Sequence, residues 1–180
     1  IKNNTGTESR KIKKPILWNN KSQITGDSIH IKFNTEKNII DSLFVFENAF
    51  IIEKDTLDKG FNQISGKRLN GNFINGKLKE VDIIKNAESI YYLRNSENEL
   101  IGIDKSKSAK IKIFINGQEI DNFTKINQID GKVFPEDDFN INDKLLKGFY
   151  FREDEIIKNI DDLFAEDSPV SYTHLRAHET

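Results

Sequence analysis

One phrase occurs twice in this chain, and it constrains the fold more than any other feature of the sequence. The phrase "QITGDSIHIKF" runs from Gln23 to Phe33, and "QISGKRLNGNF" runs from Gln63 to Phe73, 40 residues later. The two copies share Gln-Ile, a hydroxyl residue, Gly and a final Phe. Repetition at such an interval predicts a repeat architecture, in which each unit covers the apolar face of its neighbour.

A third copy follows, although it is less complete. Phe114 stands 41 residues after Phe73, and the "FINGK" that begins at Phe73 returns as "FINGQ" at Phe114. The "ENA" that ends at Ala49 likewise returns as "KNA" ending at Ala87. The sequence therefore predicts three units of about forty residues each. A chain of 180 residues is long enough to hold them in one domain.

Within each unit the hydrophobic period is two, which is the period of a β-strand. Ile29, Ile31 and Phe33 alternate with polar residues, and so do Ile111 and Ile113. Alternation of this kind places one row of side chains on a core face and the other row in water. Ile, Val, Phe and Tyr dominate these runs, as strands prefer. We therefore expect an all-β, antiparallel fold.

Two kinds of turn separate the expected strands. Asn75-Gly76 and Asn116-Gly117 are pairs that readily supply the two positive-φ residues of a tight hairpin turn. The recurring Asn-Ala pairs are interpreted as corners. Each unit is therefore predicted to consist of a strand, an Asn-Gly turn, a second strand, an Asn-Ala corner and a third strand.

Two further features of the repeat need a structural reason. Gly26 and Gly66 are interpreted as turn or bulge residues that answer a backbone need. The expected strand "SLFVFE", from Ser42 to Glu47, is apolar on both faces. Such a strand needs a cover on each side, or it marks an interaction surface.

Composition and motifs exclude several classes of function. The net charge of −2 gives no overall basic footprint for nucleic acid, and no run of about 18 apolar residues is present to span a membrane. The absence of Cys excludes disulfides and thiolate metal sites. His30 has no evident Ser or Asp partner, and the chain has no phosphate-binding Gly-rich loop. We expect no enzymatic activity, no cofactor, no metal and at most peripheral membrane contact.

The ends of the chain differ from the repeats. Residues 1–14 are polar and basic and are expected to be disordered, and the β domain is expected over 15–134. The acidic segment 135–167 is expected to be partly ordered, either packed against the last rung or hanging free. Residues 168–180 resemble translated adapter sequence and are expected to be a non-native tail. Because the chain starts at Ile1 and contains no Met, we expect a fragment or a mature product.

Several phrases carry a resemblance to a known family. They are "PILWNNKSQITGDSI", "LNGNFINGKLKEVDIIKNAESIYYL", "LIGIDKSKSAKIKIFINGQEID", and "DGKVFPED" followed by "LLKGFYFREDE". From about Pro15 to Phe164 the chain resembles the OstA-like, or LptA-like, proteins, and most of all those of Bacteroidetes-type bacteria. Lys85 stands where the family form has Gly, and "REDEII" stands where the family has Arg-Pro.

The resemblance implies both a fold and a function. Such proteins are stacked, twisted antiparallel β-jellyrolls, solenoid-like and open at both ends, in the periplasm of Gram-negative bacteria. They carry lipopolysaccharide toward the outer membrane with its acyl chains, those of lipid A, sheltered in a groove between two sheets. They associate with themselves or with other Lpt jellyroll proteins by pairing edge strands. The family is not enzymatic, so no catalytic residue is implied.

The alternating apolar rows supply candidates for the lining of a lipid-binding groove. They are Ile29, Ile31, Phe33, Leu43, Val45, Phe50 and Ile52 in the first unit, Phe73, Val81, Ile83 and Ile90 in the second, and Ile111, Ile113 and Phe123 in the third. The alternative is that these rows pack against each other as a sandwich core.

Basic residues supply candidates for contact with the phosphates of lipopolysaccharide. They are expected near strand ends, at Lys105, Lys107, Lys110, Lys67 and Arg68. The alternative is a solvated edge that resists aggregation. For the chain as a whole a second function also stays open, that of a structural or adhesive β-repeat module that binds proteins by edge-strand pairing.

Overall fold

The computed structural model of the protein is all-β, as the alternation predicts, and jellyroll-like, as the resemblance implies. It describes residues 14–19, 21–55, 57, 60–116, 119–140 and 143–156. Within these ranges there is no α-helix. Two short 3-10 turns, η1 (Glu136–Asp138) and η3 (Glu153–Glu155), follow the strands.

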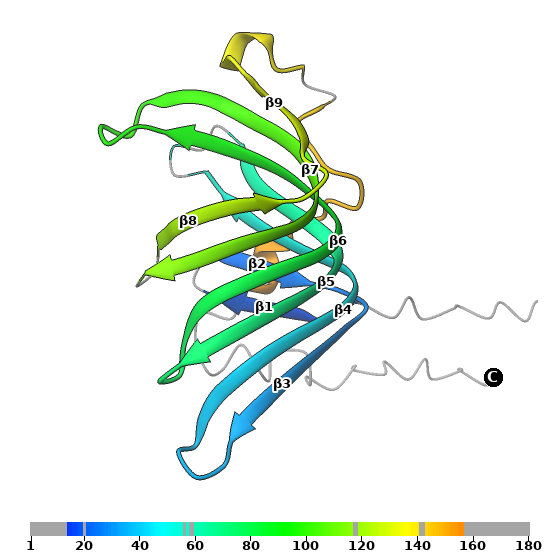
Figure 1. The fold of residues 1–180 in the computed structure, drawn as a ribbon, viewed down its shortest axis with the longest axis vertical. Helices are drawn as coiled ribbons and strands as arrows, with labels where there is room; N and C mark the ends of the chain where they lie inside the picture. The colour runs from blue at the N-terminus through cyan, green and yellow to red at the C-terminus, as the bar shows by residue number, and fades with distance from the viewer. Residues whose placement is uncertain are drawn as a thin grey trace, which may run out of the picture.

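In the described part of the chain, nine antiparallel strands form one sheet (Figure 1). They are β1 (Ile16–Asn19), β2 (Ser22–Thr25), β3 (Ser28–Asn34), β4 (Ile39–Lys54), β5 (Phe61–Ile74), β6 (Lys77–Arg94), β7 (Leu100–Asn116), β8 (Glu119–Ile126) and β9 (Asp130–Phe134). The strand order is β1-β2-β4-β5-β6-β7-β8, while β3 pairs with β4 and β9 pairs with β7.

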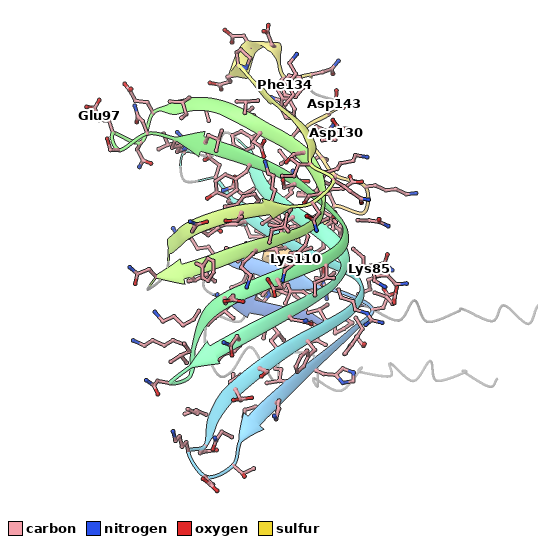
Figure 2. All side chains as sticks on the ribbon, in the orientation of Figure 1. Lys85, Glu97, Lys110, Asp130, Phe134 and Asp143 are labelled. Carbon is pink, nitrogen blue, oxygen red and sulfur yellow. The ribbon has the colours of Figure 1, made fainter. Side chains whose placement is uncertain are left out.

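The predicted Asn-Ala corners are left-handed bends inside continuous strands. β4 bends at Glu47 and Asn48, with φ of 54° and 52°, and β6 bends at Lys85 and Asn86, with φ of 65° and 51°. The pairing register shifts at each bend. A third bend, at Asn127 with φ of 59°, leads from β8 into β9. Lys85 lies at the turning point of β6 in Figure 2.

These bends divide the sheet into two layers that remain joined along the bends (Figure 1). Layer 1 holds β3, the first half of β4, the second half of β5, the first half of β6, the second half of β7, and β8. Layer 2 holds β1, β2, the other halves of β4 to β7, and β9. The protein is therefore one sheet folded over on itself.

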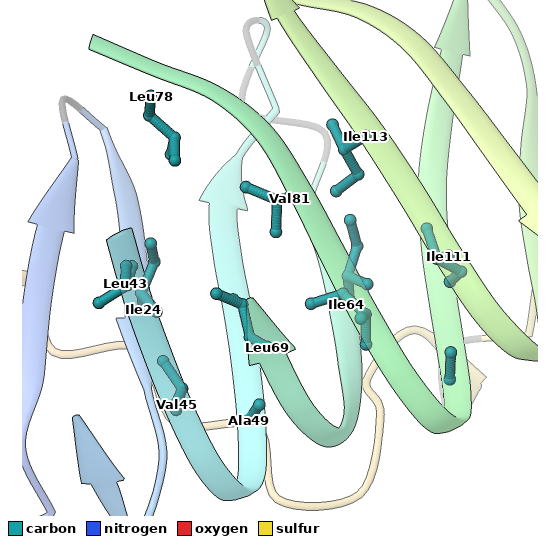
Figure 3. Close-up of a cluster of buried hydrophobic side chains, with 12 residues drawn as sticks. Ile24, Leu43, Val45, Ala49, Ile64, Leu69, Leu78, Val81, Ile111 and Ile113 are labelled. Atoms are coloured by element: carbon teal, nitrogen blue, oxygen red, sulfur yellow. The ribbon is translucent and has the colours of Figure 1, made fainter. Parts of the chain in front are cut away.

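A cluster of buried apolar side chains, the first cluster, fills the space between the layers (Figure 3). Leu43 and Val45 of layer 1 are 1% and 0% exposed, and Ile64 of layer 2 is 3% exposed. The other buried members are Ile24, Ala49, Leu69, Leu78, Val81, Ile83, Ala87, Ile111 and Ile113. Burying each large member contributes about 1.5–3 kcal/mol, which holds the two layers together.

Gly26 and Gly66 lie where the bends leave no room for a side chain. A Cβ atom at Gly26 would lie 2.2 Å from Cγ1 of Val45, and one at Gly66 would lie 2.5 Å from Cγ2 of Ile83. The interpretation of these glycines as turn or bulge residues fits their places, because Gly26 lies between β2 and β3 and the pairing register of β5 shifts beside Gly66. The structure adds a packing reason that the sequence did not show, which is the close approach of a side chain from a neighbouring strand.

The hairpin turn between β5 and β6 is also confirmed. Asn75 has φ of 52° and Gly76 has φ of 73°, which are the two left-handed residues of a tight two-residue turn. Gly117, of the second predicted turn, lies outside the described residues.

The segment after β9 crosses the face of layer 2 that is turned away from layer 1. We call residues 135–140 and 143–156 the strap. Phe139 and Leu146 of the strap are 5% and 6% exposed in a second cluster, which also contains Phe50, Ile52, Ile90, Tyr92 and Ile103. Asp143 of the strap lies 2.7 Å from Lys105 of β7, and Phe139 of the strap packs on Phe134 at the end of β9. The acidic segment is thus packed across layer 2 as far as residue 156, and residues 1–13 and 157–180 lie outside the described part.

Lys85 offers a test of the energetics of the bend. Holding a non-glycine residue in a left-handed conformation costs about 1–2 kcal/mol, and glycine avoids this cost. Glycine also has more conformational freedom to lose on folding, which takes back about 0.5–1 kcal/mol of the gain. We expect Lys85→Gly to raise the free energy of unfolding by up to about 1 kcal/mol in urea titration. Lys85→Val, with a β-branched side chain at the same φ, is expected to lower it. A Val variant as stable as the starting protein would contradict the bend.

Candidate functional site

The groove expected between two sheets corresponds to the space between layer 1 and layer 2, and most of that space is filled. Nine of the fourteen predicted lining residues belong to this region: Leu43, Val45, Val81, Ile83, Ile111 and Ile113 are buried in the first cluster, and Ile29, Phe73 and Phe123 pack against it. The six buried residues are packed on one another as in a sandwich core, with exposures of 0–3%.

Two predicted lining residues are accessible at the edge of layer 1. Ile31 is 38% exposed and Phe33 is 54% exposed, both on the edge strand β3. Ile31 pairs with Leu43, so it shares the face of layer 1 that is turned toward layer 2. These two side chains are apolar surface that a guest reaches without displacing the first cluster.

Three predicted lining residues lie on the opposite face of layer 2. Phe50, Ile52 and Ile90 belong to the second cluster and are covered by the strap. The structure therefore does not bring them together with the other candidates. Their neighbours Ile51 and Ser89 are the residues that face layer 1, because alternate residues of a strand point to opposite faces.

A cavity of about 440 Å³ lies between the layers at the β8 end of the fold. Tyr91, Leu93 and Asp104 line it from layer 2, and Phe123 and Lys125 line it from β8. The rings of Tyr91 and Phe123 stack with their centroids 5.4 Å apart. Of the predicted lining residues, Phe123 borders this cavity.

The floor of the cavity is polar and links the two layers. Lys125 of layer 1 donates to the carboxylate of Asp104 in layer 2, and the two side chains are 19% and 11% exposed. Ser106 Oγ also donates to Asp104 at 3.0 Å, and Ser106 shares a hydrogen bond of 3.0 Å with Ser89. The space between the layers is thus apolar near β4 and β5 and amphipathic near β7 and β8.

Titratable groups on the inner face of layer 2 indicate poor hydration. Burial raises the pKa of Glu53, although a hydrogen bond from the Ser22 hydroxyl partly opposes the shift. Burial likewise raises the pKa of Tyr91, with the nearby carboxylates of Glu53 and Asp55 acting in the same direction. Both shifts have burial as their largest cause, so these two side chains are partly shielded from water although they lie outside the first cluster.

The predicted phosphate contacts lie within the long strands β5 and β7, so the prediction that they lie near strand ends is wrong. Most of them already have a carboxylate partner. The pairs are Lys105 with Asp143 at 2.7 Å, Lys107 with Glu88 at 3.2 Å, Lys110 with Asp82 at 2.7 Å and Lys67 with Glu47 at 3.6 Å. Arg68 lies 5.7 Å from the ring centroid of Phe46.

Sequence reasoning gave no role to Gln63, which holds the strap in place. Its side chain is 0% exposed. Gln63 Nε2 donates to the carbonyl of Lys144 at 2.7 Å, and the amide of Leu146 donates to Gln63 Oε1 at 2.8 Å. One side-chain amide thus satisfies a carbonyl and an N–H two residues apart, as a neighbouring strand would.

Gln23, at the same place in the repeated phrase, makes the same pair of hydrogen bonds. Gln23 Nε2 donates to the carbonyl of Tyr150 at 2.8 Å, and the amide of Arg152 donates to Gln23 Oε1 at 2.7 Å. The side chain of Gln23 is also 0% exposed. The signal that would have found both clamps is the recurrence of Gln itself beside Ile in a strand.

Other classes of site find no support in the described part of the chain. It contains no group of three His, Cys, Asp or Glu residues that could hold a metal ion. None of its helices is long and apolar enough to cross a membrane. No protein-family model matches the chain, and no curated protein matches it.

Replacing Gln63 by Leu tests the clamp. The change leaves two strap groups without partners, the buried N–H of Leu146 and the part-buried carbonyl of Lys144, and an unsatisfied buried group costs about 1–3 kcal/mol. We expect Gln63→Leu to lower the free energy of unfolding by roughly 2–4 kcal/mol and to speed hydrogen exchange at the strap amides. Gln128→Leu, at an exposed position of a bend, is the control and should change stability by less than about 0.5 kcal/mol. Unchanged strap exchange in Gln63→Leu would show that the clamp does not hold the strap.

Glu53 gives a pH-dependent test of the dry inner face. Because its folded pKa is raised, ionised Glu53 destabilises the fold, and the penalty appears as pH rises through the unfolded value near 4.5. Glu53→Gln should therefore be more stable than the starting protein at about pH 7 and equally stable at about pH 3. Denaturant titrations at both pH values check this, with exposed Glu97→Gln as the control. A starting protein more stable than Glu53→Gln at neutral pH would mean that Glu53 is well solvated.

Proposed function

We propose that this chain is a non-enzymatic carrier, or part of a bridge, that moves lipopolysaccharide through the periplasm toward the outer membrane. The observation that carries the proposal is the cavity of about 440 Å³ between the two layers beside Phe123. Ligand pockets typically measure about 300–1,000 Å³ and combine apolar walls with a few polar groups. The acyl chains of lipid A are the part of the cargo that suits this space.

The energetics favour an acyl guest at the accessible parts of the groove. Burying one methylene gains ~0.8 kcal/mol, so a chain of ~12 methylenes gains on the order of 10 kcal/mol before ordering costs. Because the first cluster fills the middle of the fold, the guest binds in the β8 cavity and over Ile31 and Phe33. Tyr91 and Asp104 give the same cavity a polar side, which suits an amphiphile.

The resemblance to the OstA-like family supports the cargo and the periplasmic location. The jellyroll-like sheet agrees with the fold that the resemblance implies. Lys85 adds a local agreement, since it adopts φ of 65° at a position where the family form has glycine.

Open sheet edges support end-to-end association with a second copy or with another jellyroll protein. In layer 1, β3 and β8 lie at opposite ends of the strand order, with four strands between them. All pairings are antiparallel, so β3 and β8 run in opposite directions. Copies stacked head to tail would therefore continue the sheet by an antiparallel β8–β3 pair.

The lipid site is tested by a charge placed at its accessible edge. We expect Ile31→Glu in the full chain to weaken the affinity for lipid A at least about tenfold, as measured by displacement of a bound fluorescent acyl probe. The reason is that burying an unpaired carboxylate beside an acyl chain is costly. Ile113, which is 3% exposed, is unsuitable because a charge there would unfold the protein. Leu145→Glu, at a strap position 51% exposed and outside the groove, is the matched control.

The same measurement separates the carrier from its alternative, a structural or adhesive β-repeat module. The starting protein is expected to bind the acyl probe and to release it to lipid A. A folded protein that binds no probe, while still forming oligomers in light scattering, would favour the adhesive module. Lipid binding that survives in folded Ile31→Glu would remove Ile31 from the site.

A further inference from the structure

A second cavity, of about 1210 Å³, lies on the opposite side of layer 2 from the proposed acyl site. It is bounded by the strand bends on one side and by the strap on the other. Phe50 and Ser65 lie at its floor, Asn86 lies at its bend side, and Tyr150 lines it from the strap. The carrier function does not use this cavity.

The floor of this cavity is a row that runs across four strands. Thr25 pairs with Phe50, Phe50 pairs with Ser65, and Ser65 pairs with Glu88, so these side chains lie side by side on β2, β4, β5 and β6. Neighbouring strands are about 4.8 Å apart, which makes the row about 14 Å long. The cavity is therefore elongated along the stacking direction of the repeats.

The repeat places the same polar groups at regular intervals along this row. Thr25 and Ser65 are the hydroxyl residues of the repeated phrase, two strands apart, and therefore separated by about 10 Å. Asn48 and Asn86, the second residues of successive bends, also line the cavity with the same separation. Asn48 Nδ2 donates to Asp27 at 2.8 Å. The cavity thus offers a periodic series of hydroxyl and amide groups, each able to donate and accept.

An exposed aromatic ring stands beside this polar series. Tyr150 is 69% exposed, although its backbone is fixed by the clamp from Gln23 and by the neighbouring Arg152, which is 6% exposed. A large ring held on a fixed backbone at the side of a cavity is a flat apolar platform. The C–H face of a sugar ring packs on such a platform, while its hydroxyls remain free to bond at the edges.

The charges around this cavity largely cancel in pairs. Lys67 lies 3.6 Å from Glu47, and Arg152 donates to Glu155. Lys14 also lies 2.8 Å from Asp27, so three of the four lining cations, all but Lys147, have a carboxylate partner among the described residues. A phosphate or another compact anion therefore gains less here than it would beside unpaired cations. A neutral ligand rich in hydroxyl groups matches a lining that both donates and accepts and carries no strong net charge.

We propose that this cavity binds a segment of a neutral linear glycan, lying along the bends with one sugar ring packed on Tyr150. Hydroxyl groups of the glycan bond to Thr25, Ser65 and Asn86. The chemistry of the lining carries this assignment, which does not depend on lipid carriage.

The test is calorimetric titration of the full chain with three neutral linear oligosaccharides: cellohexaose, maltohexaose and hexa-N-acetylchitohexaose. At least one is expected to bind saturably. Tyr150→Ala should weaken that binding at least about tenfold, as loss of a central aromatic anchor does, and Ser65→Ala should weaken it several-fold. Tyr150→Phe, which keeps the ring, should retain most of the affinity. Phe114→Ala, at an aromatic residue 38% exposed on layer 1, should leave the affinity unchanged.

Either of two results would overturn the proposal. One is the absence of binding by all three oligosaccharides to a folded protein. The other is binding whose affinity is the same in Tyr150→Ala and Ser65→Ala as in the starting protein. Displacement of the acyl probe by lipid A, measured on the same variants, should be unaffected. A failure of the carrier function is thereby distinguished from a failure of the glycan site.

Discussion

The left-handed bend is the constraint on which the rest of this structure depends. Each bend puts two consecutive non-glycine residues at positive φ, as at Glu47 and Asn48, at a cost of about 1–2 kcal/mol for each residue. That cost is offset by the first cluster, which forms only because the bend brings the two halves of each strand face to face. Asn is the least costly choice at such a position after glycine, and it recurs at Asn86 and Asn127.

Folding the sheet leaves layer 2 in a different situation from layer 1. Layer 2 is covered on one face by layer 1 and on the other by the strap, so it contributes buried apolar side chains to a cluster on each face. Layer 1 has no such cover on its outer face among the described residues, and Phe44 and Phe46 are half-buried there beside exposed His30 and Arg68. The two cavities consequently lie on opposite faces of layer 2, which makes that layer the part that both proposals share.

The alternation and the repeat were enough to predict the strands, the turn at Asn75 and the corners, because each depends on local backbone chemistry. The close contact of Gly66 with Ile83 was not predicted, because it depends on a side chain from another strand. The strap was not predictable in its place, since its contacts are made between residues about eighty or more positions apart in the chain. For the same reason Ile52 was grouped with the groove. Ile51 and Ile52 are both apolar, so alternation shows that both faces are buried and does not show which cover each face receives.

Each residue of the repeated phrase contacts a different part of the molecule, and this explains why the phrase recurs as a unit. Gln faces outward and bonds to the backbone of the strap, which places no demand on the strap side chains. Ile faces inward and joins the first cluster. The hydroxyl residue faces outward again beside the bend, where it lines the second cavity. Gly lies against the side chain of the next strand, where a Cβ atom does not fit. Shifting these four residues by one position along the strand would turn each side chain to the opposite face of layer 2. Such a shift would remove the clamp and the core contact together.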